Sequence, residues 1–258
     1  MTSAVDTFGS YGRHGSLVPS QRAARAVDHV VTWIIALVLI AMAGLAGYSL
    51  WDSYNVLEGT DLSQYKPGGP GFSELLAMNP DVCAWLTVDN TQIDYPVVQG
   101  SDNFEYLSKD ATGEYSTSGS IFLDSECDRN FTEPYEVIMG HHMDAHKMFG
   151  DLDLFLDEDF FNANSKATLY LPHETLDLEV DAVLTADAYD GVILSTPADA
   201  SRLPQLIQKI DESATHYREG SITESDQVIA LSTCSSDATD ARTIVLCKVV
   251  NRYASENA

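Results

Sequence analysis

Residues 30–50, VVTWIIALVLIAMAGLAGYSL, form one long apolar run without a charged side chain. As a helix, these 21 residues reach across a hydrocarbon core of about 30 Å. Trp33, Tyr48 and Trp51 lie near the ends of the run, where interfacial aromatic side chains gather. The alternative is a cleaved signal peptide, whose apolar region is only about 7–15 residues long. We therefore predict an uncleaved transmembrane anchor over residues 30–51.

The charges around the apolar run predict its orientation. Three arginines precede the run and three carboxylates follow it: Arg13, Arg22, Arg25, Asp52, Glu58 and Asp61. By the positive-inside rule, the tail formed by residues 1–29 lies in the cytoplasm and everything after Trp51 lies outside the cell. No second apolar run of comparable length follows, so we predict a single-pass protein of the cell membrane.

The rest of the chain is predicted to be a linker and one exported domain. Residues 52–71 contain KPGGPG, which is typical of a linker, and residues 72–258 follow as the domain. The chain is 45% hydrophobic, which is enough to bury a sizeable core. Its formal net charge of -25 would repel a phosphate backbone, and this argues against nucleic-acid binding.

The exported domain is predicted to be mainly β with helical insertions. Apolar residues in 72–78 are spaced as in a short helix that stops before Asn79-Pro80. Eight β-branched or alternating runs follow, separated by turn-forming residues: 84–88, 94–99, 119–124, 135–140, 167–172, 176–186, 227–233 and 242–250. About eight short strands indicate a closed barrel or a sandwich.

Two segments between these strands have helical periodicity. Residues 148–161, MFGDLDLFLDEDFF, combine an apolar face with many carboxylates, and residues 203–217 repeat apolar side chains at spacings of three and four. The carboxylates are Asp151, Asp153, Asp157, Glu158 and Asp159. They lack the glycine-centred loop of an EF-hand, so we predict a solvated helix face rather than a calcium site.

Cys234 is the cysteine best placed for nucleophilic chemistry. It follows the strand 227–233 and begins a polar loop, whereas Cys247 lies within an apolar strand and is expected in the core. The four cysteines form no CxxC pair, so neither a zinc knuckle nor a disulfide framework is indicated. Arg242 begins the next strand, and antiparallel pairing through the loop would bring its permanently protonated guanidinium beside the sulfur.

The segment IMGHHMDAHKMF offers three imidazoles: His141, His142 and His146. His141 stands directly after a strand, where it is held best for proton transfer. A metal site is the competing interpretation, because His142 and His146 stand four residues apart. The zincin motif needs a glutamate beside its first histidine, and Met143 occupies that place here. We therefore predict no metal.

Together these segments resemble the sortases, membrane-anchored cysteine transpeptidases of Gram-positive bacteria. The resemblance is carried by ALSTC with an arginine eight residues after the cysteine, by GHHM and by MFGDL. NPDVCAWL, IDYPVVQGSDNFEYL and GSIFLD follow the family order as well. Three features are similar to those of class B sortases: the N-terminal anchor, the absence of a second apolar tail and the helix-length insertion at 199–218.

The resemblance implies a closed barrel of about eight strands, with an N-terminal helix and a long helix before the cysteine strand. It makes Cys234 the nucleophile, His141 the general acid and base, and Arg242 the group that steadies substrate and oxyanion. Residues that match the family's substrate groove are Asn103, Leu107, Ser232 and Thr233. Ala230 departs from the family, which has Thr at this position. The sequence leaves undecided whether Cys83 and Cys127 form a disulfide.

The implied activity is cleavage of a C-terminal sorting signal through a thioester, followed by transfer to an amine of the cell wall. No cofactor is required. Implied partners are secreted proteins that carry a sorting signal and a peptidoglycan precursor as acceptor, with a pilin lysine as the alternative acceptor. A metal-dependent hydrolase that uses the histidine cluster and an inactive binding domain are the competing interpretations of the function. LPHET at 171–175 superficially resembles a sorting signal, but it lies between two strands and is predicted to be a hairpin turn.

Overall fold

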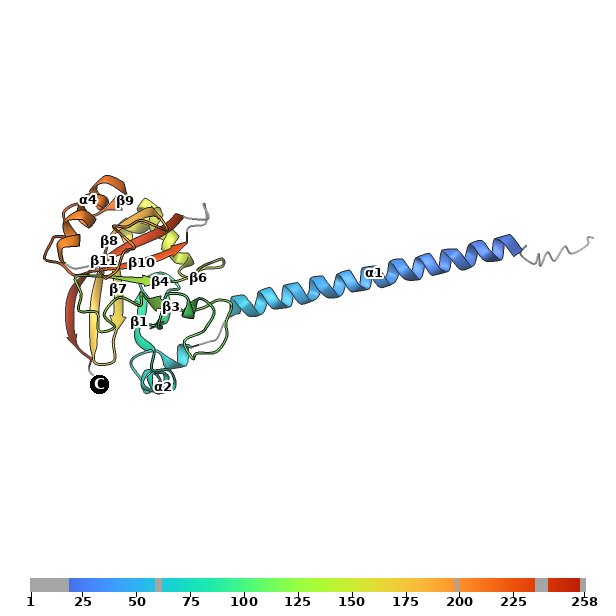
Figure 1. The fold of residues 1–258 in the computed structure, drawn as a ribbon, viewed down its shortest axis with the longest axis horizontal. Coiled ribbons are helices and arrows are strands. Elements are labelled where there is room, and N and C mark those ends of the chain that lie inside the picture. Colours follow the sequence, from blue (N-terminus) through green and yellow to red (C-terminus); the bar gives the residue numbers. More distant parts are fainter. Residues whose placement is uncertain (1–18, 59–61, 198–199, 235–240, 256–258) are drawn as a thin grey trace, which may run out of the picture. The chain divides into compact units, whose positions relative to one another are not determined.

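A computed structural model describes residues 19–58, 62–197, 200–234 and 241–255 of the chain. The chain divides into two compact units, Met1–Ser53 and Tyr54–Ala258. The first unit contains most of α1 (Pro19–Glu58), the long blue helix of Figure 1. None of the residues in its segment Ala24–Trp51 is buried, and this segment is long and apolar enough to cross a membrane. Beyond Trp51 the helix continues into the segment expected to be a linker.

The second unit is built on a closed β-barrel of eight strands. In order around the barrel they are β11 (Ala241–Ala254), β10 (Val228–Cys234), β4 (Tyr135–Met139), β3 (Ile121–Leu123), β2 (Asp94–Val98), β1 (Val82–Val88), β7 (Lys166–Tyr170) and β8 (Glu174–Asp187). Pairing of β11 with β8 closes the barrel. The pairs β10–β4 and β2–β3 are parallel and the others are antiparallel. All eight predicted strands, and the closed barrel, are confirmed.

Three shorter strands were not expected from the sequence. β5 (His142–Met143) and β6 (Lys147–Met148) form a small antiparallel ribbon of their own. β9 (Ala214–Tyr217) pairs with β8 outside the barrel. The apolar spacing of 203–217 therefore does not describe one helix, because α4 (Leu203–Ser213) ends at Ser213 and the next four residues are extended.

Other helical segments are short, and they are placed near their expected positions. α2 (Gly71–Met78) ends before Asn79 as predicted. Residues 148–161 do not form the expected continuous helix: the 3-10 segment η3 (Gly150–Leu156) is followed by α3 (Glu158–Ala163). The break is at Asp157, whose side chain caps α3 by accepting a hydrogen bond from the N–H of Phe160. The segment LPHET is the predicted turn between β7 and β8, where the N–H of Leu171 donates to the carbonyl of Glu174.

Apolar clusters fill the barrel and cover parts of its outside. The interior cluster includes Leu86, Ile138 and Val245, all fully buried. A second cluster packs α4 against the outer face of β4, β10, β11 and β8, and a third packs α2 against the outer face of β1, β2 and β3. Figure 1 shows α2 and α4 on opposite sides of the barrel. β10 is thus buried on both faces, which explains its nearly continuous apolar sequence.

Glu136 on β4 is a fully buried carboxyl group. Burial is the main cause that raises its pKa from 4.5 to about 8, and nearby Glu133 and Asp128 raise it further. The folded state therefore holds a proton that the unfolded chain releases at lower pH. The fold is therefore most favoured below about pH 4.5, where both states are protonated, and this advantage is lost as the pH rises from there through about 8.

We expect Glu136→Gln to become more stable than the natural chain as the pH rises from 4.5 to 9, by a few kcal/mol at most. The amide keeps the shape of the protonated acid and cannot ionise. Thermal unfolding of both chains across this pH range measures the difference. The exposed Glu126→Gln is the control for removal of a solvated carboxylate. A difference in stability that does not vary with pH would contradict the assignment.

Candidate active site

Three neighbouring strands lead to positions 141, 234 and 242. β10 lies between β4 and β11, and in its antiparallel pairing with β11 Cys234 stands opposite Arg242. On the other side, Ser232 of β10 pairs with Met139 of β4 in parallel. The N–H of Gly140 donates to the carbonyl of Ser232 at 3.2 Å, so the pairing continues past the end of β4. Continued past the end of β4, the same register would put position 141 next to position 234.

The outer face of the sheet at this site is marked by the apolar cluster under α4. Along β4, β10 and β11, alternate residues enter the outer cluster under α4: Tyr135, Val137, Val228, Ala230, Ile244 and Leu246. Because side chains alternate with a period of two along a strand, Arg242 of β11 falls on this outer face. The Cys234 side chain and residues 235–240 lie outside the described part of the structure.

His141 is fixed by a backbone carbonyl. Its Nε2 lies 2.9 Å from the carbonyl oxygen of Leu107. A carbonyl only accepts, so Nε2 carries the hydrogen and Nδ1 is the nitrogen left for proton exchange. His142 and His146 are engaged differently: His142 Nε2 lies 3.1 Å from Asp153 Oδ2, and His146 Nδ1 lies 2.5 Å from Asp151 Oδ1.

Arg242 is partly buried, and its Nε is a buried donor that meets no acceptor among the described residues. A guanidinium has five N–H donors and stays charged at every physiological pH. A buried N–H donor without an acceptor costs free energy. The Arg242 guanidinium can therefore bind an anionic or carbonyl oxygen that accepts the missing hydrogen bond.

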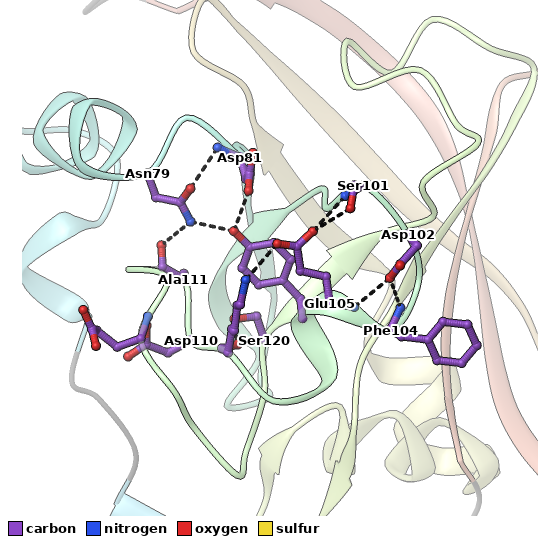
Figure 2. Close-up of polar contacts among 12 residues, drawn as sticks. Asn79, Asp81, Ser101, Asp102, Phe104, Glu105, Asp110, Ala111 and Ser120 are labelled. Atoms are coloured by element: carbon purple, nitrogen blue, oxygen red, sulfur yellow. Dashed lines mark hydrogen bonds and ion pairs between the residues drawn. The ribbon is translucent and has the colours of Figure 1, made fainter.

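The backbone that carries the Leu107 carbonyl is held by a buried tyrosine. Tyr106 lies in the 3-10 turn η2 (Glu105–Leu107) and is 2% exposed. Its hydroxyl donates to Asp81 Oδ2 at 2.8 Å and accepts from Asn79 Nδ2 at 2.9 Å. These two partners, Asn79 and Asp81, are labelled in Figure 2. Asn79 Nδ2 also donates to the carbonyl of Ala111. Burial raises the pKa of Tyr106 to about 12, so the hydroxyl keeps the proton that it donates.

Two carboxylates hold the same turn from its surface side. Asp102 accepts from the N–H groups of Phe104 and Glu105, and Glu105 accepts from Ser101 and from Lys109 Nζ. Figure 2 shows the ring of Phe104 pointing away from this network. The turn, and with it the Leu107 carbonyl, is therefore fixed from both sides.

The four expected groove residues differ in their surroundings. The Leu107 side chain is 36% exposed. The amide of Asn103 donates to Asp124 Oδ2 at 2.7 Å and accepts from the N–H of Ser125. Ser232 and Thr233 are fully buried, and their hydroxyl groups meet no partner among the described residues. Of these four side chains, only that of Leu107 is clearly open to solvent.

The prediction of a solvated acidic helix face is wrong for two of its five carboxylates. Asp151 is 2% exposed and accepts from the N–H of Gln92 as well as contacting His146. Asp153 is partly buried, contacts His142 and accepts from Thr243 Oγ1 at 2.6 Å. The sequence did not reveal these bonds, because they join segments that are far apart in the chain. Within the described ranges, no three His, Cys, Asp or Glu side chains are grouped to hold a metal.

Cys83, Cys127 and Cys247 are free thiols buried in the domain, so the structure contains no Cys83–Cys127 disulfide. Burial raises the pKa of Cys83 and of Cys127 to about 12 and raises that of Cys247 as well. Thiols with such pKa values remain protonated and weakly nucleophilic.

Comparison with known proteins identifies relatives over most of the exported domain. A family model described as Sortase domain matches residues 86–250. The chain is 30% identical over 183 residues to the protein named Sortase B of Listeria monocytogenes, covering 69% of this chain and 74% of that protein. A solved Streptococcus pyogenes class B sortase involved in pilus biogenesis is 37% identical, with a TM-score of 0.62, over 70% of this chain and all of that one. Clostridium perfringens sortase B is 33% identical over the same shares, with a TM-score of 0.65.

We expect Cys83, Cys127 and Cys247 to resist alkylation in the native chain at pH 8, and to react once guanidinium chloride unfolds it. The physical reason is their burial and their raised pKa values. Iodoacetamide labelling followed by peptide mass spectrometry measures each site. Rapid native labelling of any of the three would show that the core is more open than described.

A second prediction concerns the glycine that packs on the η2 turn. Gly119 has φ +60, and a Cβ there would lie 2.7 Å and 2.8 Å from the carbonyl oxygens of Tyr106 and Leu107. Gly113 also has positive φ, but a Cβ there meets open space. Thermal unfolding should show a loss of about 1 kcal/mol for Gly113→Ala from backbone strain, and about 1–3 kcal/mol more for Gly119→Ala from overlap. Equal losses would mean that Gly119 does not constrain the turn.

Proposed function

Because the chain belongs to the sortase family of cysteine transpeptidases, and its relatives are class B members, we propose that Cys234, His141 and Arg242 are its catalytic residues. The observation that carries the proposal is the strand order β11-β10-β4, in which Cys234 stands opposite Arg242 and the pairing of β10 with β4 continues to Gly140, the residue before His141. Thiolate, imidazole and guanidinium are the groups that acyl transfer by cysteine requires.

In the first half-reaction, the Cys234 thiolate attacks the carbonyl carbon of the threonine in a C-terminal sorting signal. A carbon–sulfur bond forms, and the carbonyl oxygen becomes an anion that the Arg242 guanidinium stabilises. The tetrahedral species then collapses and the peptide carbon–nitrogen bond breaks. His141 donates a proton to the departing amine, and a thioester on Cys234 remains.

In the second half-reaction, an acceptor amine attacks the thioester carbon. His141, now neutral, takes the proton that the amine loses, and Arg242 again stabilises the oxyanion. The new amide forms as the carbon–sulfur bond breaks and Cys234 regains its thiolate. Since Nε2 of His141 is held by Leu107, Nδ1 is the atom that exchanges the proton in both halves. No cofactor takes part in these steps.

The apolar helix supports a location at the cell membrane for this reaction. Residues 30–51 anchor the chain in the cell membrane, with residues 1–29 in the cytoplasm, residues 52–71 as the connection and the catalytic domain of residues 72–258 outside. An anchored enzyme meets secreted substrates and wall precursors at a raised effective concentration. We assign the groove for the sorting signal to Asn103 and to the exposed Leu107 side chain, which is an apolar contact, because Ser232 and Thr233 are fully buried.

The acceptor that we propose is a peptidoglycan amine. The alternative is a lysine amine of a pilin, and one observation favours it: a relative 37% identical is described as a class B sortase involved in pilus biogenesis. The chemistry of both acceptors is the same, since each supplies a primary amine for attack on a thioester.

The full chain in detergent micelles, incubated with a library of sorting peptides and both classes of amine, tests the activity. We expect peptide cleavage and ligation, read by mass spectrometry, to fall at least about 10²-fold in Cys234→Ala, His141→Ala and Arg242→Ala. The matched control is His173→Ala, which removes an exposed imidazole from the distant β7–β8 turn and should leave activity unchanged.

Full activity in all three variants would overturn the proposed mechanism. Activity that is lost with a chelator but retained in Cys234→Ala would favour a metal-dependent hydrolase instead. The ratio of ligation to the peptidoglycan amine and to the pilin lysine separates the two acceptors.

A further inference from the structure

We propose that Asp153 is a positioning residue for the reaction, because its carboxylate joins the residue that follows His141 to the residue that follows Arg242. The inference rests on the proposed function above. It assigns to one side chain the task of fixing the imidazole and the guanidinium at a constant separation on either side of Cys234.

The contacts of Asp153 lie directly next to the two catalytic positions. Thr243 Oγ1 donates to Asp153 Oδ1 at 2.6 Å, and His142 Nε2 lies 3.1 Å from Asp153 Oδ2. Thr243 is fully buried and follows Arg242 in β11, while His142 follows His141 and begins β5. One carboxylate therefore links β11 to the loop after β4, and these are the two segments that flank Cys234.

The segment that carries Asp153 is packed tightly enough to hold this side chain in a fixed position. η3 buries Leu152 and Phe155 completely in the interior cluster. The N–H of Phe149 donates to the carbonyl of His141 at 3.0 Å, which ties the start of this segment to the histidine backbone. Gly150 approaches the carbonyl of Met143 so closely that a Cβ there would lie 2.3 Å from the oxygen. A displacement of Asp153 is therefore transmitted to its partners.

Asp151 provides a matched comparison on the same segment. It is buried, it accepts from the N–H of Gln92 at 2.6 Å, and it contacts His146 at the tip of the β5–β6 ribbon. Neither of these partners is a neighbour of a catalytic position. Loss of either carboxylate removes polar contacts from η3, but only the loss of Asp153 releases Thr243 and His142.

The test measures Cys234 itself and needs no known substrate. Iodoacetamide alkylation of Cys234 in the full chain, in detergent micelles, is followed by peptide mass spectrometry between pH 5 and pH 9. A thiolate gains stability from cations held close to it, so Asp153→Ala should raise the apparent pKa of Cys234 and slow alkylation at neutral pH about tenfold. Asp151→Ala should remain within about twofold of the natural chain.

Two further variants separate positioning from charge. Asp153→Asn removes the charge but keeps an acceptor for Thr243, so it should restore most of the rate. Thr243→Val removes one of the donors, and adding Asp153→Ala to it should then have a smaller effect than in the natural chain. Failure of Asp153→Asn to restore the rate would contradict positioning through these contacts.

The outcomes distinguish this inference from the proposed function. Equal slowing in Asp153→Ala and Asp151→Ala, or no slowing in either, would overturn the role of Asp153 alone, provided that His141→Ala slows alkylation. If His141→Ala alkylates like the natural chain, the assignment of His141 beside Cys234 is wrong, and the role of Asp153 falls with it.

Discussion

Everything at the candidate site depends on how one strand is paired. β10 runs parallel to β4 on one side and antiparallel to β11 on the other. Parallel pairing brings the ends of β10 and β4 to the same edge, and antiparallel pairing brings the start of β11 to that edge too. A one-residue slip in either pairing would turn every side chain of the slipped strand to the opposite face of the sheet. The register is therefore the constraint on which the proposed meeting of positions 141, 234 and 242 depends.

The core explains why this register is held. β10 is buried between the barrel interior and the cluster under α4, so a slip would exchange its two apolar faces and break both clusters. Less regular segments then complete the site. The η2 turn supplies the Leu107 carbonyl to His141, and η3 supplies Asp153 to the neighbours of His141 and Arg242. A rigid sheet thus sets the positions, and turns anchored by buried polar bonds orient the side chains.

The sequence predicted what depends on local pattern. Alternating and β-branched runs marked all eight barrel strands, and the short loop between 227–233 and 242–250 implied that Cys234 and Arg242 face each other. It did not predict the parallel pairing of β10 with β4, which joins segments about ninety residues apart. The Leu107 carbonyl carries no residue-specific signal, and the acidic run in 151–159 gave no sign that Asp151 and Asp153 turn inward.

An experimental structure of the chain with Cys234 reduced tests the central claim most directly, through the distances from its sulfur to the two flanking groups. The account predicts His141 Nδ1 and the Arg242 guanidinium on opposite sides of the sulfur, each within about 4 Å or one bridging water of it. A sulfur directed into the barrel, with the imidazole and guanidinium on the outer face, would contradict the account.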